Sequence, residues 1–498
     1  MRPRHVAYII WIVIAALGIV CCVVPKDGFN IGKWNLRWPT LAQVLEIQNS
    51  DDRDYSDIDT AWVNDLDTTL DSIDEHSSFV QTTSPKSSIQ PLEPNYQRVD
   101  SAQRAIGPLS QPYPDIEVSE PIVSPITSTN DSRIFLAAFY QALDSAQQMP
   151  IRVVHYGDSQ IEEDRITNKL RERWQKQYGG GGVGLIPLHQ TIPTRSIRQW
   201  ISINGVRQNV KGGPKRYLIY GPRSMRQESN DYGVMGQVAV LDSNLVAGSH
   251  QVEMHIEPID KKHHPHKYFS QIRLLSNGIN SETTVENSIF YPTVHNNQTL
   301  FYLPDSTTQC TMHLQGSGKV YGISLETPTG VMVDNIPMRG CSGTFFTRID
   351  SKPLQDYFYH TNTRLIIMQF GGNMIPQSSS KAIIAGYVKN LRQQVRHLRT
   401  CAPQASILFV GPSDMSTRIN GQMDTYPLIP YLDSLLKRMA QEEQIAYWSI
   451  YDAMGGKGSM LSWVNNGLAG SDYVHFTRTG ANKIGELLGK WIDEGKNQ

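Results

Sequence analysis

The order of strand-like and helix-like segments constrains the fold of this chain more than any other feature. A buried strand pattern, IRVVHY, leads into a helix pattern, and strands and helices alternate again from residue 327 onward. Such alternation predicts a parallel sheet that is covered by helices on both faces. The later helices are expected at 381–399, 429–441 and 479–494. We therefore expect a three-layer α/β/α domain.

A different pattern interrupts this alternation at residues 194–326. Short alternating segments such as QVEMHIE, SQIRLLS and VYGISLE are separated by Gly, Asn, Pro and Asp, without a helix pattern between them. Many short strands at near-regular spacing are typical of a β-sandwich or jelly roll. The α/β domain is thus predicted in two parts, 127–193 and 327–498, around an inserted β-sandwich whose candidate role is carbohydrate binding.

The N-terminal quarter predicts a membrane anchor and a tether. Two Arg precede an uncharged run from Val6 to Val24, and roughly 20 such residues span a bilayer. The positive charge ahead of the run predicts a cytoplasmic N-terminus, with the remaining chain in the periplasm or on the cell surface. A cleaved signal peptide is the alternative, although the run is long and no small-x-small site follows it. We expect an uncleaved transmembrane helix in 1–25 and a low-complexity tether over 26–126.

The charge, cysteine and histidine content argue against nucleic-acid binding, a disulfide framework and a metal site. The chain has 46 basic and 47 acidic residues and a formal charge of −1, so no strong field is available to attract nucleic acid. Of five Cys, two lie in the apolar run, and three are too few for a disulfide framework. The histidines of DKKHHPHKYF lie in a Lys-rich stretch, which favours a solvated loop over a metal site. These histidines are His263, His264 and His266.

Two polar segments are candidates for chemistry. Ser159, in the sequence Gly-Asp-Ser, follows the first strand where a helix pattern begins, so its hydroxyl and backbone N–H are expected at the carboxyl edge of the sheet. An ordinary helix cap is the alternative. Asp472 precedes His475 by three residues in a loop that opens the last helix, a spacing that lets a carboxylate orient an imidazole. Residues 162–164 are expected in the first helical turn after Ser159, where acidic side chains complement the dipole.

Two further positions follow the second and third strands of the α/β pattern. Gly340 is expected in a turn, where a glycine permits close backbone approach, and Asn373 offers side-chain N–H donors. Both properties suit stabilisation of an oxyanion, although each position taken singly is also typical of a turn.

In this order the four segments resemble the conserved blocks of the SGNH hydrolase family, also called GDSL-type esterases. The resemblance implies a flavodoxin-like α/β/α fold, with Ser159 as nucleophile, His475 as general base and Asp472 as the residue that orients it. It also implies that the N–H groups of Ser159, Gly340 and Asn373 form the oxyanion hole. The resemblance covers the two α/β segments alone.

Three positions depart from the family pattern. Gln160 replaces the leucine of the founding signature, Met374 replaces an aspartate, and Pro337 stands where a glycine is common. None of the three changes removes a catalytic atom.

The segment GDSQIEEDRIT and the β insertion are similar to bacterial cell-envelope members that act on O-acetylated polysaccharide or peptidoglycan. We therefore expect a serine esterase that removes O-acetyl groups through an acyl-enzyme, with no metal or organic cofactor. Its partners would be the glycan and the membrane. An O-acetyltransferase with the same residues, a non-catalytic glycan-binding scaffold, and a phospholipase or thioesterase are the alternatives.

Overall fold

A computed structural model describes residues 29–31, 34–36, 131–190, 192–208, 213–242, 252–259, 268–295, 298–305 and 307–497. The predicted transmembrane segment, most of the tether and the three neighbouring histidines lie outside these ranges. Within the ranges, no helix is both long enough and apolar enough to cross a membrane. From the tether region, β1 (Phe29–Ile31) and β2 (Trp34–Leu36) pair as an antiparallel hairpin.

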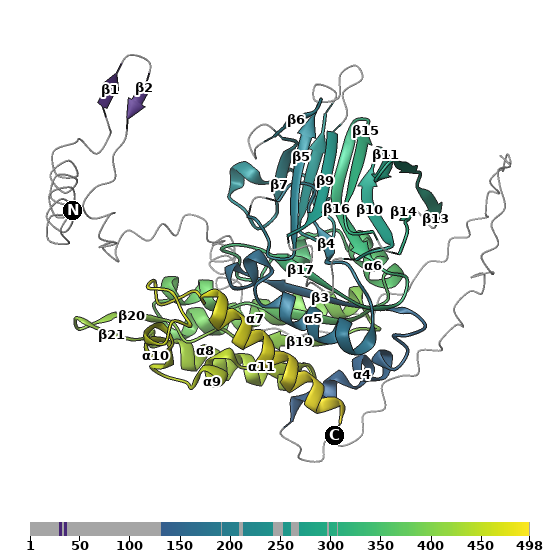
Figure 1. Ribbon diagram of the computed structural model, residues 1–498. Helices are drawn as coiled ribbons and strands as arrows, with labels where there is room; N and C mark the ends of the chain where they lie inside the picture. The colour runs from purple at the N-terminus through teal and green to yellow at the C-terminus, as the bar shows by residue number, and fades with distance from the viewer. Residues whose placement is uncertain are drawn as a thin grey trace, which may run out of the picture. The chain divides into compact units, whose positions relative to one another are not determined.

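A parallel sheet forms the centre of the α/β domain (Figure 1). Its strands pair in the order β17-β3-β18-β19-β22, and every pairing is parallel, as the alternation of strands and helices predicts. Apolar residues cover both faces, which explains the near-continuous hydrophobic runs in the sequence. The strands are β3 (Pro150–Gly157), β17 (Gly330–Pro337), β18 (Thr363–Gln369), β19 (Ser406–Val410) and β22 (Ala446–Trp448).

Helices lie on both faces of this sheet. On one face, apolar residues of α4, α5 and α11 pack with alternate strand residues into a single core. On the other face α7 packs against both α6 and α8 (Figure 1). These helices are α4 (Ala137–Leu143), α5 (Thr167–Tyr178), α6 (Ser351–His360), α7 (Lys381–Cys401), α8 (Ile429–Glu442) and α11 (Arg478–Lys496).

Shorter elements complete the α/β domain. A β20–β21 hairpin follows β19, and its first residue, Ser416, donates its backbone N–H to the carbonyl of Tyr473. The short elements are η1 (Ser132–Leu136), η2 (Ser159–Asp164), η5 (Phe346–Arg348), η6 (Gly372–Gln377), β20 (Ser416–Ile419), β21 (Gln422–Thr425), α9 (Ile450–Met454) and α10 (Ser459–Asn465).

The insertion consists of two antiparallel sheets that enclose their own apolar core (Figure 1). One sheet has the order β13-β14-β10-β16-β8-β7, and the other has the order β12-β11-β15-β9-β5-β6. Their elements are β5 (Ile197–Ile203), β6 (Val206–Arg207), β7 (Lys215–Leu218), η3 (Arg223–Met225), β8 (Gln237–Leu241), β9 (Val252–Pro258), β10 (Gln271–Asn277), β11 (Asn280–Val285), β12 (Ser288–Phe290), β13 (Thr293–His295), β14 (Gln298–Tyr302), β15 (Cys310–Gln315) and β16 (Gly318–Glu326).

The sandwich also takes in a strand that precedes residue 194. β4 (Gly184–Ile186) pairs with β16, although the alternation pattern assigns these residues to the first α/β segment. A strand of three residues is too short to show a period of two, so its sheet is decided by tertiary pairing.

Buried charges join the sandwich to the parallel sheet. Arg152 of β3 lies 2.6 Å from Asp334 of β17 and also pairs with Glu326 of β16. Arg273 of β10 reaches the other oxygen of Glu326 at 2.8 Å. All four side chains are at most 8% exposed, and their two positive and two negative charges balance. A buried charge is tolerated only when paired, so this cluster, which we call the interdomain ion cluster, favours one arrangement of the two layers.

Candidate functional site

The nucleophile candidate lies directly after β3, at the carboxyl edge of the sheet. Gly157 ends the strand, and a Cβ at this position would come within 3.0 Å of Ile161. Asp158 then accepts a hydrogen bond from the backbone N–H of Gln160 at 2.9 Å. Ser159 follows at the start of η2 and is 9% exposed. The chain therefore turns sharply at Ser159 and holds its hydroxyl at the edge of the sheet.

His475 reaches Ser159 from the opposite end of the chain. The distance from Ser159 Oγ to His475 Nε2 is 2.8 Å, and the distance from His475 Nδ1 to Asp472 Oδ2 is 2.7 Å. The second oxygen of Asp472 accepts the backbone N–H groups of Val474 at 3.0 Å and His475 at 3.1 Å. The hydroxyl, imidazole and carboxylate thus form one continuous hydrogen-bonded chain.

Asp472 carries a negative charge under ordinary conditions. Burial tends to raise the pKa of its carboxyl, but the hydrogen bond and charge of His475 and two backbone N–H groups outweigh burial and lower that pKa to about 2. The ionised carboxylate selects the His475 tautomer with hydrogen on Nδ1. Nε2 is therefore available to accept the Ser159 proton.

The structure brings Asn373 and the segment after Gly340 next to this series of hydrogen-bonded side chains. Gly340 is buried and has a φ of 72°, a left-handed conformation that favours glycine. Asn373 donates from Nδ2 to the carbonyl of Cys341 at 3.0 Å and to Asp158 Oδ2 at 3.3 Å. Both amide hydrogens are thus engaged, so a bound oxyanion has to replace one of these partners.

Asp158 is a candidate site residue that the sequence pattern does not single out. Burial raises the pKa of its carboxyl to about 6, although the N–H of Gln160 and the charge of His475 lower it. Its two oxygens connect the turn at Ser159 with Asn373. In the sequence the same aspartate is typical of a helix cap, and only the fold places Asn373 beside it.

The segment after Ser159 differs from the predicted helix. Glu163 and Asp164 have φ angles of 59° and 62°, and α5 begins only at Thr167, so the prediction of a helical first turn at 162–164 is wrong. Asp164 is held by the buried Arg171, at 3.2 Å for one of their two contacts. Arg195 of the insertion forms an ion pair with Glu163, and the distance from Arg195 Nη2 to Glu163 Oε2 is 3.1 Å. These ion pairs stabilise a left-handed turn that local propensity alone disfavours.

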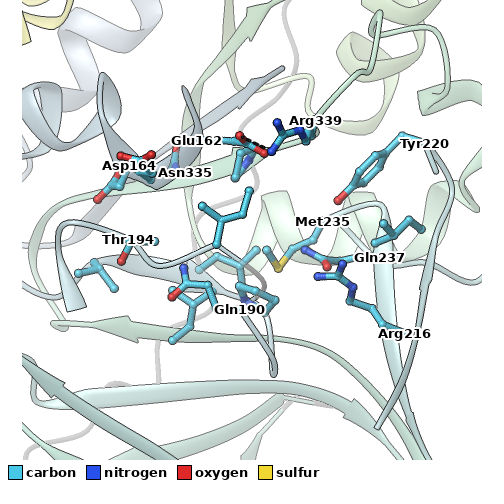
Figure 2. Close-up of a pocket in the computed structure, with 18 of the residues that line it drawn as sticks. Glu162, Asp164, Gln190, Thr194, Arg216, Tyr220, Met235, Gln237, Asn335 and Arg339 are labelled. Carbon is cyan, nitrogen blue, oxygen red and sulfur yellow. Dashed lines mark ion pairs between the residues drawn. The ribbon is translucent and has the colours of Figure 1, made fainter. Parts of the chain in front are cut away.

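A pocket of about 240 Å³ lies between this turn and the insertion (Figure 2). Its apolar wall includes Leu185, Leu218 and Met235. At its rim Glu162 and Arg339 form an ion pair at 3.5 Å, which Figure 2 shows as a dashed line. Burial raises the pKa of Glu162, and the neighbouring charge of Arg339 opposes that rise. Because Glu162 and Arg339 adjoin the segments of Ser159 and Gly340, the pocket opens beside the candidate site.

Two other groups of residues bear on ligand binding. Trp200 stacks on His255 with ring centroids 5.0 Å apart, and the guanidinium of Arg207 lies 5.0 Å from its ring centroid, so this indole is packed by protein groups. Across the described residues, no group of three or more His, Cys, Asp or Glu side chains is arranged to hold a metal ion.

Comparisons with known proteins bear on the family and the fold. The model of the GDSL-like lipase/acylhydrolase family matches residues 305–483, a range that contains Gly340, Asn373, Asp472 and His475. Ser159 lies outside the match. No curated protein matches the sequence.

Solved structures supply the fold comparison. The chain is similar to a peptidoglycan O-acetylesterase with 20% identity and a TM-score of 0.57, over 74% of this chain and 99% of that chain. A Bacillus subtilis protein (11% identity, TM-score 0.27) covers 59% of this chain and 90% of its own. An acetyl xylan esterase (12% identity, TM-score 0.26) covers 32% of this chain and 80% of its own. The last two scores are too low to show a shared fold.

The parallel sheet, the serine at its carboxyl edge and the family match together define a serine hydrolase that removes acyl groups. The match to the GDSL-like lipase/acylhydrolase model over residues 305–483 agrees with the resemblance to the SGNH hydrolase family.

Proposed function

We propose that this protein is an O-acetylesterase that acts on a cell-envelope glycan, with Ser159, His475 and Asp472 as its catalytic triad. The observation that carries the proposal is the continuous hydrogen-bonded chain with contacts of 2.8 Å and 2.7 Å. A serine, an imidazole and an ionised carboxylate in this geometry are the parts required for nucleophilic acyl transfer.

The reaction proceeds in two steps. His475 Nε2 takes the proton of Ser159 as Oγ attacks the ester carbonyl, and Asp472 stabilises the imidazolium that forms. The oxyanion is bound by N–H groups of Ser159, Gly340 and Asn373, and Asn373 exchanges its contact with Asp158 for the oxyanion. His475 then gives this proton to the sugar oxygen as its bond to the acyl carbon breaks, so the sugar leaves as a free hydroxyl. Water, deprotonated by His475, attacks the acyl-enzyme and releases acetate and free Ser159.

The pocket beside the site favours a substrate larger than a simple ester. It lies against the insertion and combines an apolar wall with the charged rim of Glu162 and Arg339. A sugar residue next to the acetylated one would present both apolar CH groups and polar substituents to such walls. The similarity to a peptidoglycan O-acetylesterase supports peptidoglycan or a related O-acetylated polysaccharide as substrate.

The N-terminal sequence supports action outside the cytoplasm. In this proposal the uncharged run of residues 6–24 anchors the chain in the membrane, and residues 26–126 span the distance to the polymer. Fractionation of cells that produce the full-length chain checks this part. Recovery in the soluble cytoplasmic fraction would contradict it.

Acetate release from purified O-acetylated peptidoglycan tests the enzymatic proposal. The full-length protein is expected to release acetate, and Ser159→Ala is expected to release none above background. Ser434→Ala, which removes an exposed hydroxyl from α8, is the matched control and should retain wild-type activity. Equal activity of Ser159→Ala and wild type would remove Ser159 from the mechanism.

The same experiment separates hydrolysis from acyl transfer. With unacetylated glycan present, an esterase still releases free acetate as its main product. Net transfer of labelled acetyl to the added glycan would identify an O-acetyltransferase that uses the same residues.

A further inference from the structure

A second histidine lies buried behind the candidate site. His155 of β3 is 0% exposed, and its Nδ1 lies 2.9 Å from Thr167 Oγ1 at the start of α5. Its Nε2 lies 3.1 Å from the atom placed as Oε1 of Gln369, at the end of β18. Thr167 Oγ1 also lies 2.7 Å from Asn335 Oδ1 on β17. Thus one hydrogen-bonded chain crosses three neighbouring strands.

This chain of hydrogen bonds ends at η2, the turn that carries the candidate nucleophile Ser159. Asn335 Nδ2 donates at 3.1 Å to the carbonyl of Ile161, which lies in η2 just after Ser159. Asn335 stands opposite His155 in the β17–β3 pairing, and Gln369 stands opposite Gly157 in the β18–β3 pairing. The three strands that the chain crosses lead to Ser159, Gly340 and Asn373.

The hydrogen bonds have one consistent direction. Asn335 donates to a carbonyl through Nδ2, so its oxygen accepts the single hydroxyl proton of Thr167. The Thr167 oxygen can then only accept from His155, which places the imidazole hydrogen on Nδ1.

The remaining nitrogen of His155 settles the orientation of Gln369. Burial lowers the pKa of His155 to about 3, so the ring is neutral and Nε2 accepts a hydrogen bond. Gln369 must therefore turn its amide nitrogen toward the ring, because the oxygen and nitrogen of an amide are assigned from their hydrogen bonds. This orientation also supplies a partner for Gln369 Nε2, which otherwise is buried without one.

We propose that His155 and Thr167 are positioning residues that hold the Ser159 turn in register with the Gly340 and Asn373 segments, by passing one directed hydrogen-bond chain from Gln369 to the Ile161 carbonyl. The inference rests on the proposed esterase function. Neither residue touches the reacting atoms. Their effect is geometric: Asn335 and Ile161 are fixed relative to each other only if every donor in the chain meets an acceptor.

Two substitutions at Thr167 isolate this role. Thr167→Val keeps the shape of the side chain but removes the hydroxyl, so Asn335 Oδ1 loses its donor and His155 Nδ1–H loses its acceptor. Thr167→Ser keeps the hydroxyl. Displacement of catalytic groups by about 1 Å can cost roughly 100-fold in rate, so we expect Thr167→Val to lower kcat for 4-nitrophenyl acetate by about 10- to 100-fold with KM within about twofold. Thr167→Ser is expected to restore kcat to within about threefold.

A control separates positioning from loss of stability. Thr283 lies fully buried in the sandwich strand β11, and its hydroxyl has no hydrogen-bond partner among the described residues. Thr283→Val should leave kcat and KM unchanged, and thermal unfolding shows what fraction of each variant is folded. Wild-type kcat in folded Thr167→Val would overturn the proposal.

Nitrogen NMR of histidine-labelled full-length protein gives a readout that does not depend on activity. The proposal requires the His155 signal of a neutral ring with hydrogen on Nδ1, and a hydrogen on Nε2 would overturn it. The outcome for the esterase itself is distinguishable. If wild type and Ser159→Ala are equally inactive on esters, the proposed function fails, whereas an active wild type with an unaffected Thr167→Val rejects the positioning role alone.

Discussion

Two regions of this molecule place a histidine ring nitrogen beside a hydroxyl group. In the surface loop before α11, His475 lies 2.8 Å from Ser159, and inside the sheet His155 lies 2.9 Å from Thr167. The third partners differ: His475 contacts the carboxylate of Asp472, whereas His155 contacts the amide of Gln369. Exposure differs as well, because the His475 side chain is 38% exposed and His155 is fully buried.

The difference shows that a hydroxyl–imidazole pair does not by itself make a nucleophile. A carboxylate can stabilise the imidazolium that forms when the hydroxyl proton is taken, whereas a neutral amide cannot. Burial further disfavours a charged ring at His155. We therefore expect Thr167 to keep its proton, whereas the proposed function requires Ser159 to give up its proton.

The largest effect is expected when the carboxylate partner of His475 is replaced by an amide. Asp472→Asn gives His475 the same kind of partner that His155 has, so the imidazolium loses its stabilising charge. We expect kcat for 4-nitrophenyl acetate to fall roughly 1,000- to 10,000-fold. Steady-state kinetics with wild type as reference measure the effect. A decrease of less than about tenfold would mean that Asp472 has no such role.

The next test compares the side-chain amides of Gln369 and Asn373, which are close together in the sequence. Gln369 faces His155, whereas Asn373 contacts Asp158, the residue that precedes Ser159. Removal of one oxyanion donor typically costs 100- to 1000-fold in rate, so Asn373→Ala should lower kcat by roughly that amount with KM little changed. If KM rises in proportion and kcat stays constant, Asn373 binds the ground state of the substrate as strongly as the transition state.

The pH dependence of stability tests whether His155 stays neutral in the folded protein. The unfolded chain protonates His155 below pH 6.5, but the folded protein does so only near pH 3. As pH falls through this window, the free energy of unfolding should therefore decrease by up to about 1.4 kcal/mol per pH unit. His155→Gln should remove this part of the slope in urea unfolding series. Identical slopes for variant and wild type would show that His155 does not titrate in this window.

The smallest expected effect concerns recognition rather than proton transfer. Gln190 lines the pocket (Figure 2), and neither histidine is among the residues that line it. Gln190→Trp should fill part of the pocket and raise KM for acetylated glycan by roughly tenfold, which corresponds to about 1.4 kcal/mol. The kinetics of 4-nitrophenyl acetate, which is too small to need the pocket, should stay unchanged. An equal change for both substrates would place the effect in the chemical machinery.

The two histidines also mark what the sequence could predict. His475 stands in a loop, three residues after an aspartate, and Ser159 follows a strand, so local patterns suffice to nominate both. The parallel sheet follows from alternation in the same way. His155 is a single polar residue in the apolar run IRVVHY, and its two hydrogen-bond partners, Thr167 and Gln369, come from separate elements. Nothing local distinguishes it from an accommodated core histidine.

Other features escaped sequence analysis for the same physical reason. The left-handed turn at Glu163 and Asp164 depends on Arg171 and on Arg195 of the insertion, which outweigh helix propensity. The protonation of Asp158 depends on burial, which raises the pKa of its carboxyl, and that carboxyl accepts a hydrogen bond from Asn373. Each involves contacts between segments whose approach is decided by the completed fold rather than by their own residues.

The interdomain ion cluster bears on how this enzyme can be shortened or recombined. Deletion of the sandwich would take away Glu326 and Arg273 and leave Arg152 and Asp334 without these charged partners. It would also remove Arg195 from the turn after Ser159. The catalytic half is therefore not a free-standing module with an optional accessory. Transplanting the insertion into a related hydrolase would require these charged partners to move with it.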